Sequence, residues 1–240
     1  MHQRRYGSVL LAFALAACGG GEPGDDGGGD GAPDSGGECR AGAMASTDRL
    51  LPIAVGNIWR YQVTDQAGVD PPSVKRQEIT EEMTPAGETE PVLVQVTTKS
   101  TGQTVNWLRP VGDAMVRVQQ EDYDADGLLE RTTVYEPYKL RLDETAERLA
   151  LGNPFEESYT SIVYDPQGLE TGRTDIVDQW EVTSLESPCD TPWGQLSCVR
   201  IHRERLVGGI AVKDYYFARG YGKVREVGGQ LEELTDCSLQ

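Results

Sequence analysis

The chain has 240 residues, and its 22 lysines and arginines against 39 aspartates and glutamates give a formal net charge of −17 at pH 7. Nucleic acid is therefore excluded as a partner, because binding to phosphate backbones requires clustered Lys and Arg. About 200 residues follow a glycine-rich segment near the start, which is enough for one domain with a substantial core.

The first residues have the pattern of an export signal. Arg4 and Arg5 precede an apolar run over residues 9–17, which ends at Cys18 and three glycines. The run is too short to span a bilayer comfortably, and the glycines would end a helix. We therefore predict a signal peptide over residues 1–17.

The end of this segment, Leu15-Ala16-Ala17-Cys18, resembles the lipobox of bacterial lipoproteins. The resemblance implies that the Cys18 thiol carries a diacylglyceryl group, that palmitate is incorporated, and that Cys18 begins the mature chain. Two or three acyl chains hold a protein at a membrane almost permanently. The anchor would make the membrane a partner and place the protein in the cell envelope, in the outer membrane if the host is Gram-negative. A secretory signal cleaved elsewhere and an uncleaved helix are the alternatives.

Residues 18–38 are expected to form a tether. Residues 19–38 contain ten glycines and six acidic residues, so they cannot bury enough surface to offset their ordering entropy. Loss of residues 1–17 removes two arginines and no acid, which leaves 20 basic residues against 39 acidic ones and a charge of −19. We expect residues 39–240 to form a single β-rich domain and a monomer.

Apolar and polar residues alternate with a period of two through this domain, and turn residues recur roughly every 8 to 15 residues. The pattern predicts an all-β fold, an antiparallel meander that forms a curved sheet, half-barrel or barrel. In chain order, the apolar members of the alternating segments are Trp59, Tyr61 and Val63; Val92, Val94 and Val96; Val116 and Val118; Trp180 and Val182; and Val199 and Ile201.

Two segments depart from plain alternation. Residues 143–149 are the one plausible helix, and we expect it to be short. Residues 51–59 and 150–155 both contain Gly-Asn, one further residue and then a large aromatic residue. This repeat predicts two weakly related halves that meet near residue 145 and share one sheet.

The cysteines indicate an oxidising compartment. Commitment of Cys18 to lipid leaves four, which allow three pairings. The residues between Cys189 and Cys198 read as a hairpin loop, which favours that pair and leaves Cys39 to pair with Cys237. Free buried thiols are the alternative.

The sharpest metal-ligand pattern is D-Y-D-A-D-G over residues 122–127, which matches the start of an EF-hand loop. Asp122, Asp124 and Asp126, with Glu130 at position nine, offer the oxygen ligands that Ca²⁺ prefers. Position twelve is Thr133, where a bidentate Glu belongs, and the flanks read as strands rather than helices. The alternative is an Asp-Gly hairpin turn with solvated acids and no cofactor.

Catalytic motifs are absent from the sequence. It contains no G-x-S-x-G elbow, no H-E-x-x-H, no P-loop and no dinucleotide fingerprint. His202 is the only histidine left after processing, and its alternation with Val199 and Ile201 predicts a position on the solvent face. We therefore expect a protein that is not an enzyme.

A binding protein is the rival to a bare structural module. A concave sheet face lined by aromatic residues would hold an apolar ligand such as an acyl chain, or would contact an envelope protein. In the alternative, the same residues simply form the core, and a pocket of a few hundred Å³ would distinguish the two. The aromatic residues are Trp59, Tyr61, Trp107, Trp180, Tyr216 and Phe217.

Three segments, residues 51–61, 182–200 and 215–224, resemble a group of uncharacterised β-rich lipoproteins common in myxobacteria. That group has an opening P-L-x-x-G-N-x-W-x-Y, a turn V-P-A-G-x-F and a closing Y-Y-A-R-G-V-G-L-V. Here Trp193, Leu196 and Tyr221 replace an alanine, an aromatic residue and a valine. A looser resemblance is to the half-barrel sheets of periplasmic lipoprotein carriers. Both resemblances imply a fold and carry no chemistry.

Overall fold

The computed structural model describes residues 39, 48–85 and 87–240. The predicted signal peptide over residues 1–17, the lipidated Cys18 and the tether over residues 18–38 lie outside the described residues. Within the described ranges there is no helix with the length and hydropathy needed to cross a membrane.

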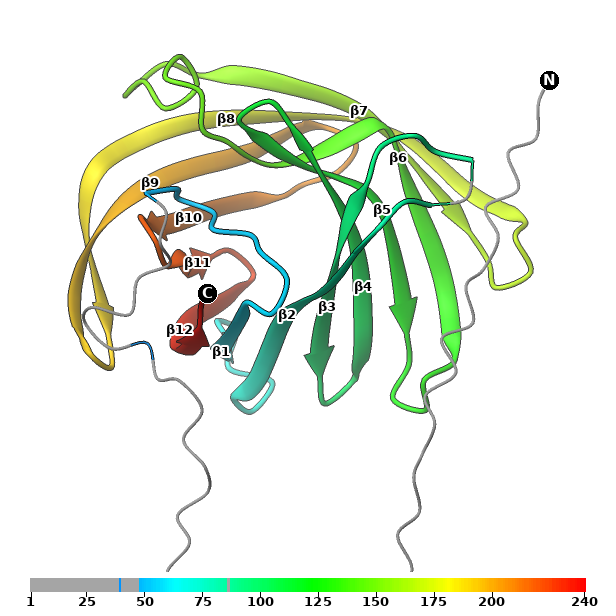
Figure 1. Cartoon of the computed structure of the whole chain (residues 1–240), viewed down its shortest axis with the longest axis horizontal. Helices are drawn as coiled ribbons and strands as arrows, with labels where there is room; N and C mark the ends of the chain where they lie inside the picture. Colours follow the sequence, from blue (N-terminus) through cyan, green and yellow to red (C-terminus); the bar gives the residue numbers. More distant parts are fainter. Residues whose placement is uncertain (1–38, 40–47, 86) are drawn as a thin grey trace, which may run out of the picture.

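The described residues form twelve antiparallel strands, each paired with its neighbours in the sequence, and β1 pairs with β12 to close a barrel (Figure 1). The predicted all-β meander is confirmed, in its closed form. The strands are β1 (Ile58–Asp65), β2 (Ser73–Met83), β3 (Val92–Lys99), β4 (Gly102–Val111), β5 (Ala114–Tyr123), β6 (Leu129–Asp143), β7 (Phe155–Tyr164), β8 (Glu170–Thr191), β9 (Gly194–Val207), β10 (Val212–Ala218), β11 (Gly222–Val227) and β12 (Gln230–Ser238).

Residues 143–149 do not form the predicted helix. Asp143 is the last residue of β6, and bends and turns follow it to residue 150. The Glu144 side chain makes long-range contacts, because its carboxylate accepts the backbone N–H groups of Leu50 and Leu51 at 2.7 and 3.3 Å. A long-range contact therefore outweighs the local preference of this segment.

The two Gly-Asn segments have the same local structure. Gly56 and Gly152 have φ angles of 91° and 68°, and in both turns the amide of the following Asn donates to the carbonyl three residues before it. The Gly56 N–H also bonds to Ile79 of β2, and the Gly152 N–H bonds to Val182 of β8. Each turn thus leads into one hairpin, β1–β2 or β7–β8, and six strands lie on either side of residues 144–154.

Large side chains fill much of the interior. Trp180 stacks on Tyr215 with ring centroids 5.8 Å apart, and Phe217 lies 6.2 Å from Tyr215. Twelve strands make a wide ring, and residues 48–57 run across it in the view of Figure 1. Leu50 of this segment is completely buried in the same cluster as Trp180.

Candidate functional site

The aromatic residues predicted to line a concave face separate into different environments. Five of the six are buried, and four of these lie in the two main core clusters: Trp59, Tyr61, Trp180 and Phe217. Trp107, the fifth, lines a separate cavity. The placement of Tyr216 on the inner face was wrong. Neighbouring strand residues point to opposite faces, so Tyr215 points inward and Tyr216 lies on the outer face. There it is partly buried against a core cluster and lies 5.7 Å from the guanidinium groups of Arg200 and Arg225.

An ionic network lies in the interior beside Tyr61. It consists of Lys75, Lys213, Lys223, Glu226 and Glu232. Glu226 and Glu232 are directly opposite each other on β11 and β12, so their carboxylates would repel. Lys223 donates to both carboxylates, at 2.6 Å to Glu232. The Tyr61 hydroxyl donates to the Lys223 carbonyl at 3.0 Å, which fixes the network to β1.

The pKa values in this network follow from that geometry. Burial alone would raise the pKa of Glu232, but the ammonium groups of Lys223 and Lys75 lower this pKa to about 2. Lys223 and Lys213 likewise hold the pKa of Glu226 far below its usual range, against burial. Burial and the neighbouring Lys223 lower the pKa of Lys75 to about 7, while Glu232 opposes this change.

A second interior group consists of cations that have no matching carboxylates. This cationic cluster comprises Arg117 of β5, Lys139 and Arg141 of β6, and Arg203 of β9. None of the four forms an ion pair with another described residue. The Nε atoms of Arg117 and Arg203 are buried, and they too have no hydrogen-bond partner in the described part of the chain.

Aromatic rings take the place of carboxylates around the cationic cluster. The Arg203 guanidinium lies 5.4 Å from the Trp180 ring and 5.7 Å from the Tyr215 ring. The Lys139 ammonium lies 5.4 Å from the Tyr135 ring. Cation–π contacts of this kind stabilise a desolvated cation by about 2 kcal/mol, which is far less than the cost of taking the charge out of water.

The cationic cluster and the ionic network meet at a small cavity of about 30 Å³. A register shift between β5 and β6 beside Val116 allows both Leu140 and Arg141 to line this cavity, although they are neighbours in the strand. A cavity of this size holds one or two water molecules or a small anion. Its lining includes the aromatic residues Trp59, Trp180 and Phe217 and the cationic residues Arg141, Arg203 and Lys223.

The second cavity has a volume of about 240 Å³. Its apolar lining includes Trp107, Val134, Pro85 and Pro137. Its charged lining residues include Arg109, which forms an ion pair with Glu88 at 3.5 Å. The positive charge of Arg109 is therefore already balanced by a carboxylate of the protein.

The structure does not gather the predicted calcium ligands. Asp122 is buried and pairs with Arg131 at 2.8 Å, whereas the Asp124 carboxylate accepts the backbone N–H of Asp126 at 2.9 Å. Asp126 and Glu130 are exposed. Among the described residues no group of three His, Cys, Asp or Glu side chains is arranged to hold a metal ion. Asp122 and Tyr123 end β5, and residues 124–128 form the hairpin turn to β6.

His202 lies on the outer face of β9, where its alternation with Ile201 had placed it. About a third of its side chain is exposed, and its Nδ1 lies 3.0 Å from Asp214. Asp214 also accepts a hydrogen bond from Arg200 at 2.9 Å. This surface triad has no second imidazole and no nucleophile within it.

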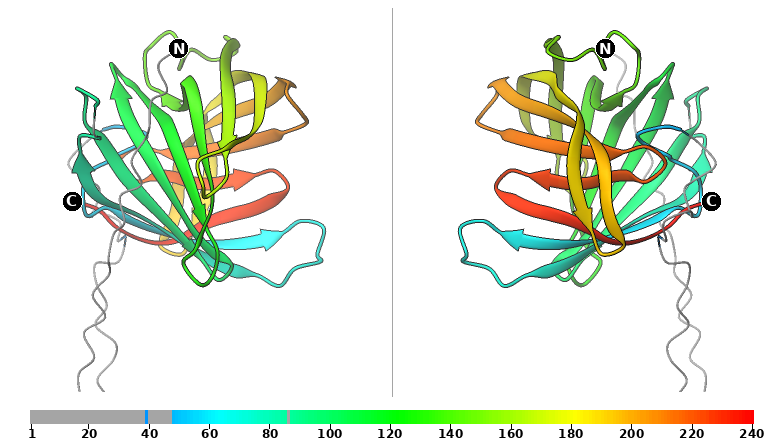
Figure 2. Two further views of the ribbon diagram at one scale, coloured as in Figure 1. Left: turned by 90° about the vertical axis from the view of Figure 1, so that its right-hand side faces the viewer. Right: turned by 90° about the vertical axis from the view of Figure 1, so that its left-hand side faces the viewer.

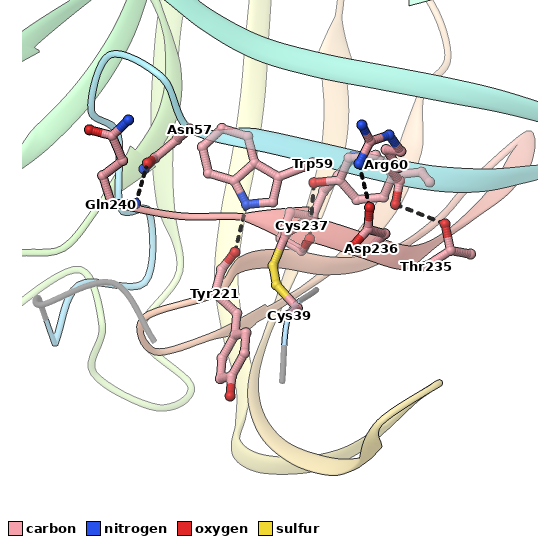
Figure 3. Close-up of a disulfide and its surroundings, with 11 residues drawn as sticks. Cys39, Asn57, Trp59, Arg60, Tyr221, Thr235, Asp236, Cys237 and Gln240 are labelled. Carbon is pink, nitrogen blue, oxygen red and sulfur yellow. Dashed lines mark hydrogen bonds and ion pairs between the residues drawn. A yellow bond between two sulfur atoms is a disulfide. The ribbon is translucent and has the colours of Figure 1, made fainter. Parts of the chain in front are cut away.

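The four described cysteines lie in the two pairs expected from the sequence. Cys39 and Cys237 form one disulfide, with Cα atoms 5.0 Å apart, and Cys189 and Cys198 form the other, with Cα atoms 6.1 Å apart. Figure 3 shows the first bridge beside Trp59. It fastens the residue that follows the predicted tether to the last strand of the barrel.

The hairpin closed by the second disulfide curls over β11 and β12 (Figure 2). Its tip residue Trp193 stacks on Tyr221, with ring centroids 6.3 Å apart. The Tyr221 carbonyl accepts the Trp59 indole N–H at 2.7 Å, and a Cβ at Gly222 would come within 3.1 Å of that indole nitrogen. Trp193 and Tyr221 are two of the three departures from the lipoprotein motif, and they contact each other.

No protein-family model and no curated protein matches this chain. Two crystal structures align with most of it. One, of a protein described as exported and with a YmcC-like fold from Bacteroides fragilis, has 12% identity and a TM-score of 0.47, and the alignment covers 78% of this chain and 98% of that one. The other, of a protein described as a lipoprotein from Parabacteroides distasonis, has 13% identity and a TM-score of 0.43, with 80% and 100% covered.

Proposed function

We propose that this chain is a lipid-anchored protein of the cell envelope and that its barrel is a non-catalytic module that acts by binding. The observation that carries the proposal is Leu15-Ala16-Ala17-Cys18, which follows two arginines and an apolar run. The myxobacterial lipoprotein motifs in residues 51–61, 182–200 and 215–224 support it. In a Gram-negative host the anchor would lie in the outer membrane.

The Cys39–Cys237 disulfide supports the proposal by giving the tether a fixed point. A glycine-rich coil of the length of residues 18–38 has a root-mean-square reach of roughly 25 Å, so the barrel can stand clear of the membrane. The tether would end at Cys39, whose disulfide connects it to β12. Because β12 is hydrogen-bonded to both β1 and β11, tension on the anchor would be shared across the sheet.

The size of the cavity beside Trp59 and Trp180 argues against a carrier whose apolar ligand lies among the core aromatic residues. Pockets for small molecules usually measure about 300 to 1,000 Å³, whereas the cavity beside Trp59 and Trp180 measures about 30 Å³. These rings pack as core. An acyl chain would enter only if the barrel opened.

Substitution of the anchor cysteine tests the proposal. Because acylation and processing both need the thiol, Cys18→Ser should abolish incorporation of labelled palmitate and leave a longer, unprocessed precursor. Cys39→Ser is the matched control, since it also removes one thiol near the N-terminus but should keep the label. Equal labelling of the wild-type protein and Cys18→Ser would refute the proposal.

A further inference from the structure

The barrel interior carries an excess of positive charge, although the chain as a whole has a net charge of −17. Three carboxylates act on members of the cationic cluster, and all are already engaged; one of them, Glu226, is paired with Lys213 and Lys223 in the ionic network. Asp178 is completely buried and accepts hydrogen bonds from Arg205, the shorter at 2.9 Å. Glu157 accepts the Trp180 indole N–H at 3.1 Å and the Leu140 amide. None of the three carboxylates is ion-paired with a member of the cluster.

This excess is costly in the absence of a counter-ion. Burial, together with the guanidinium groups of Arg117 and Arg203, lowers the pKa of Arg141 to about 10. Burial and the same arginines lower the pKa of Lys139 well below its usual value. A desolvated charge without a partner destabilises a fold by several kcal/mol. A bound anion would therefore stabilise the four clustered cations.

The small cavity beside the cationic cluster provides the space for a counter-ion. Arg141, Arg203 and Lys223 all line it. The Arg203 guanidinium lies over the rings of Trp180 and Tyr215, and its Nε–H has no hydrogen-bond partner among the described residues. The planar N–H donors of a guanidinium match the oxygen atoms of carboxylate and phosphate groups.

We propose that the barrel interior binds a small oxyanion, a carboxylate or phosphate group, between Arg141 and Arg203. Lys223 also lines the cavity, and it forms ion pairs with Glu226 and Glu232. It therefore connects the proposed site to the ionic network. The oxyanion is a free small anion, because a cavity of about 30 Å³ has no room for an acyl chain beside it. This inference depends on the barrel alone and not on the anchor at Cys18.

The test uses the full-length protein in detergent, dialysed exhaustively into chloride buffer. Inorganic phosphate, acetate and hexanoate are titrated at constant ionic strength by calorimetry, and thermal unfolding is followed in parallel, because a ligand of the native state raises the melting temperature. Saturable binding of phosphate or acetate is expected. Hexanoate is the size control and should bind no more tightly than acetate, because the cavity has no room for its additional methylene groups. Absence of saturable binding by both phosphate and acetate would overturn the proposal.

Two variants assign the site to the cationic cluster. Arg141→Gln should weaken binding about tenfold or more, since it removes a charge-assisted hydrogen bond. Without oxyanion it should melt at or above the wild-type temperature, because it relieves repulsion. Arg173→Gln makes the same change at an exposed position and should bind like wild type. A drop in the Arg141→Gln melting temperature that is equal with and without phosphate would mark Arg141 as a packing residue and overturn the assignment. Arg203→Gln repeats the binding test if Arg141→Gln does not fold.

Discussion

At the scale of single residues, Glu232 has the most demanding position in the barrel. Its carboxylate accepts hydrogen bonds from Lys75 and Lys223, and all three side chains are less than a tenth exposed. Removal of one member of a buried, paired group leaves the others uncompensated, which costs more than the pair contributes while intact. Glu232 therefore matters because two cations depend on it.

The first prediction concerns this carboxylate. Glu232→Gln should destabilise the protein by about 3 to 5 kcal/mol at pH 7, as measured by urea unfolding. Glu233→Gln is the neighbouring control; it is about half exposed and should change stability by about 0.5 kcal/mol or less. Equal effects of the two substitutions would contradict the interior network.

The pH dependence gives a second readout of Glu232. Its pKa falls from 4.5 to about 2 in the folded state, so its stabilising contribution is complete above pH 4.5 and is lost as the pH falls toward 2. In the wild-type protein the free energy of unfolding should decrease across this window. Glu232→Gln should show a shallower decrease, and an unchanged slope would contradict the lowered pKa.

At the scale of elements, the segment before β1 is held in place from the far side of the barrel. Glu144 follows β6, and its side chain is only a tenth exposed. It accepts the N–H groups of Leu50 and Leu51 and also pairs with Arg49 at 3.3 Å. Leu51 in turn lines the interior cavity, so one carboxylate secures one side of the proposed oxyanion site.

The second prediction tests this clamp. Glu144→Ala should lower the free energy of unfolding by about 1 to 3 kcal/mol, since it leaves partly buried N–H groups unpaired. Amide hydrogen exchange of residues 50–57 should become faster while exchange in β8 and β9 stays unchanged. Glu147→Ala, at an exposed position in the same loop, should alter neither. Unchanged exchange at residues 50–57 in Glu144→Ala would show that packing alone holds the segment.

The strands were predictable from the sequence because an alternation of apolar and polar residues can be recognised within a short segment. The interior cations were harder to predict. Arg117 lies between Val116 and Val118, so it looked like a solvent-face residue, and register shifts on both sides of it changed its direction. The inward direction of Arg203 was predictable, because it follows Val199 and Ile201 at every second position of the strand. Its charge argued for solvent, and only the stacked rings of Trp180 and Tyr215 explain its burial.

At the scale of the whole molecule, the chain combines a net charge of −17, a closed barrel and a predicted anchor at Cys18, which lies outside the described residues. The Cys39–Cys237 bridge links these parts, because it ties the segment after the tether to a strand in the closed sheet. The Cys189–Cys198 bridge holds the hairpin that covers β11 and β12. Such an arrangement is suited to a domain that is held at a surface while it binds a small solute.

The most direct measurement is mass spectrometry of the protein extracted from membranes, digested without reduction. The N-terminal peptide should begin at Cys18 with the mass of a diacylglyceryl group and its acyl chains, and Cys39 should be found joined to the peptide that contains Cys237. A mature chain that begins at another residue, or an unmodified Cys18 thiol, would contradict the lipid-anchored barrel.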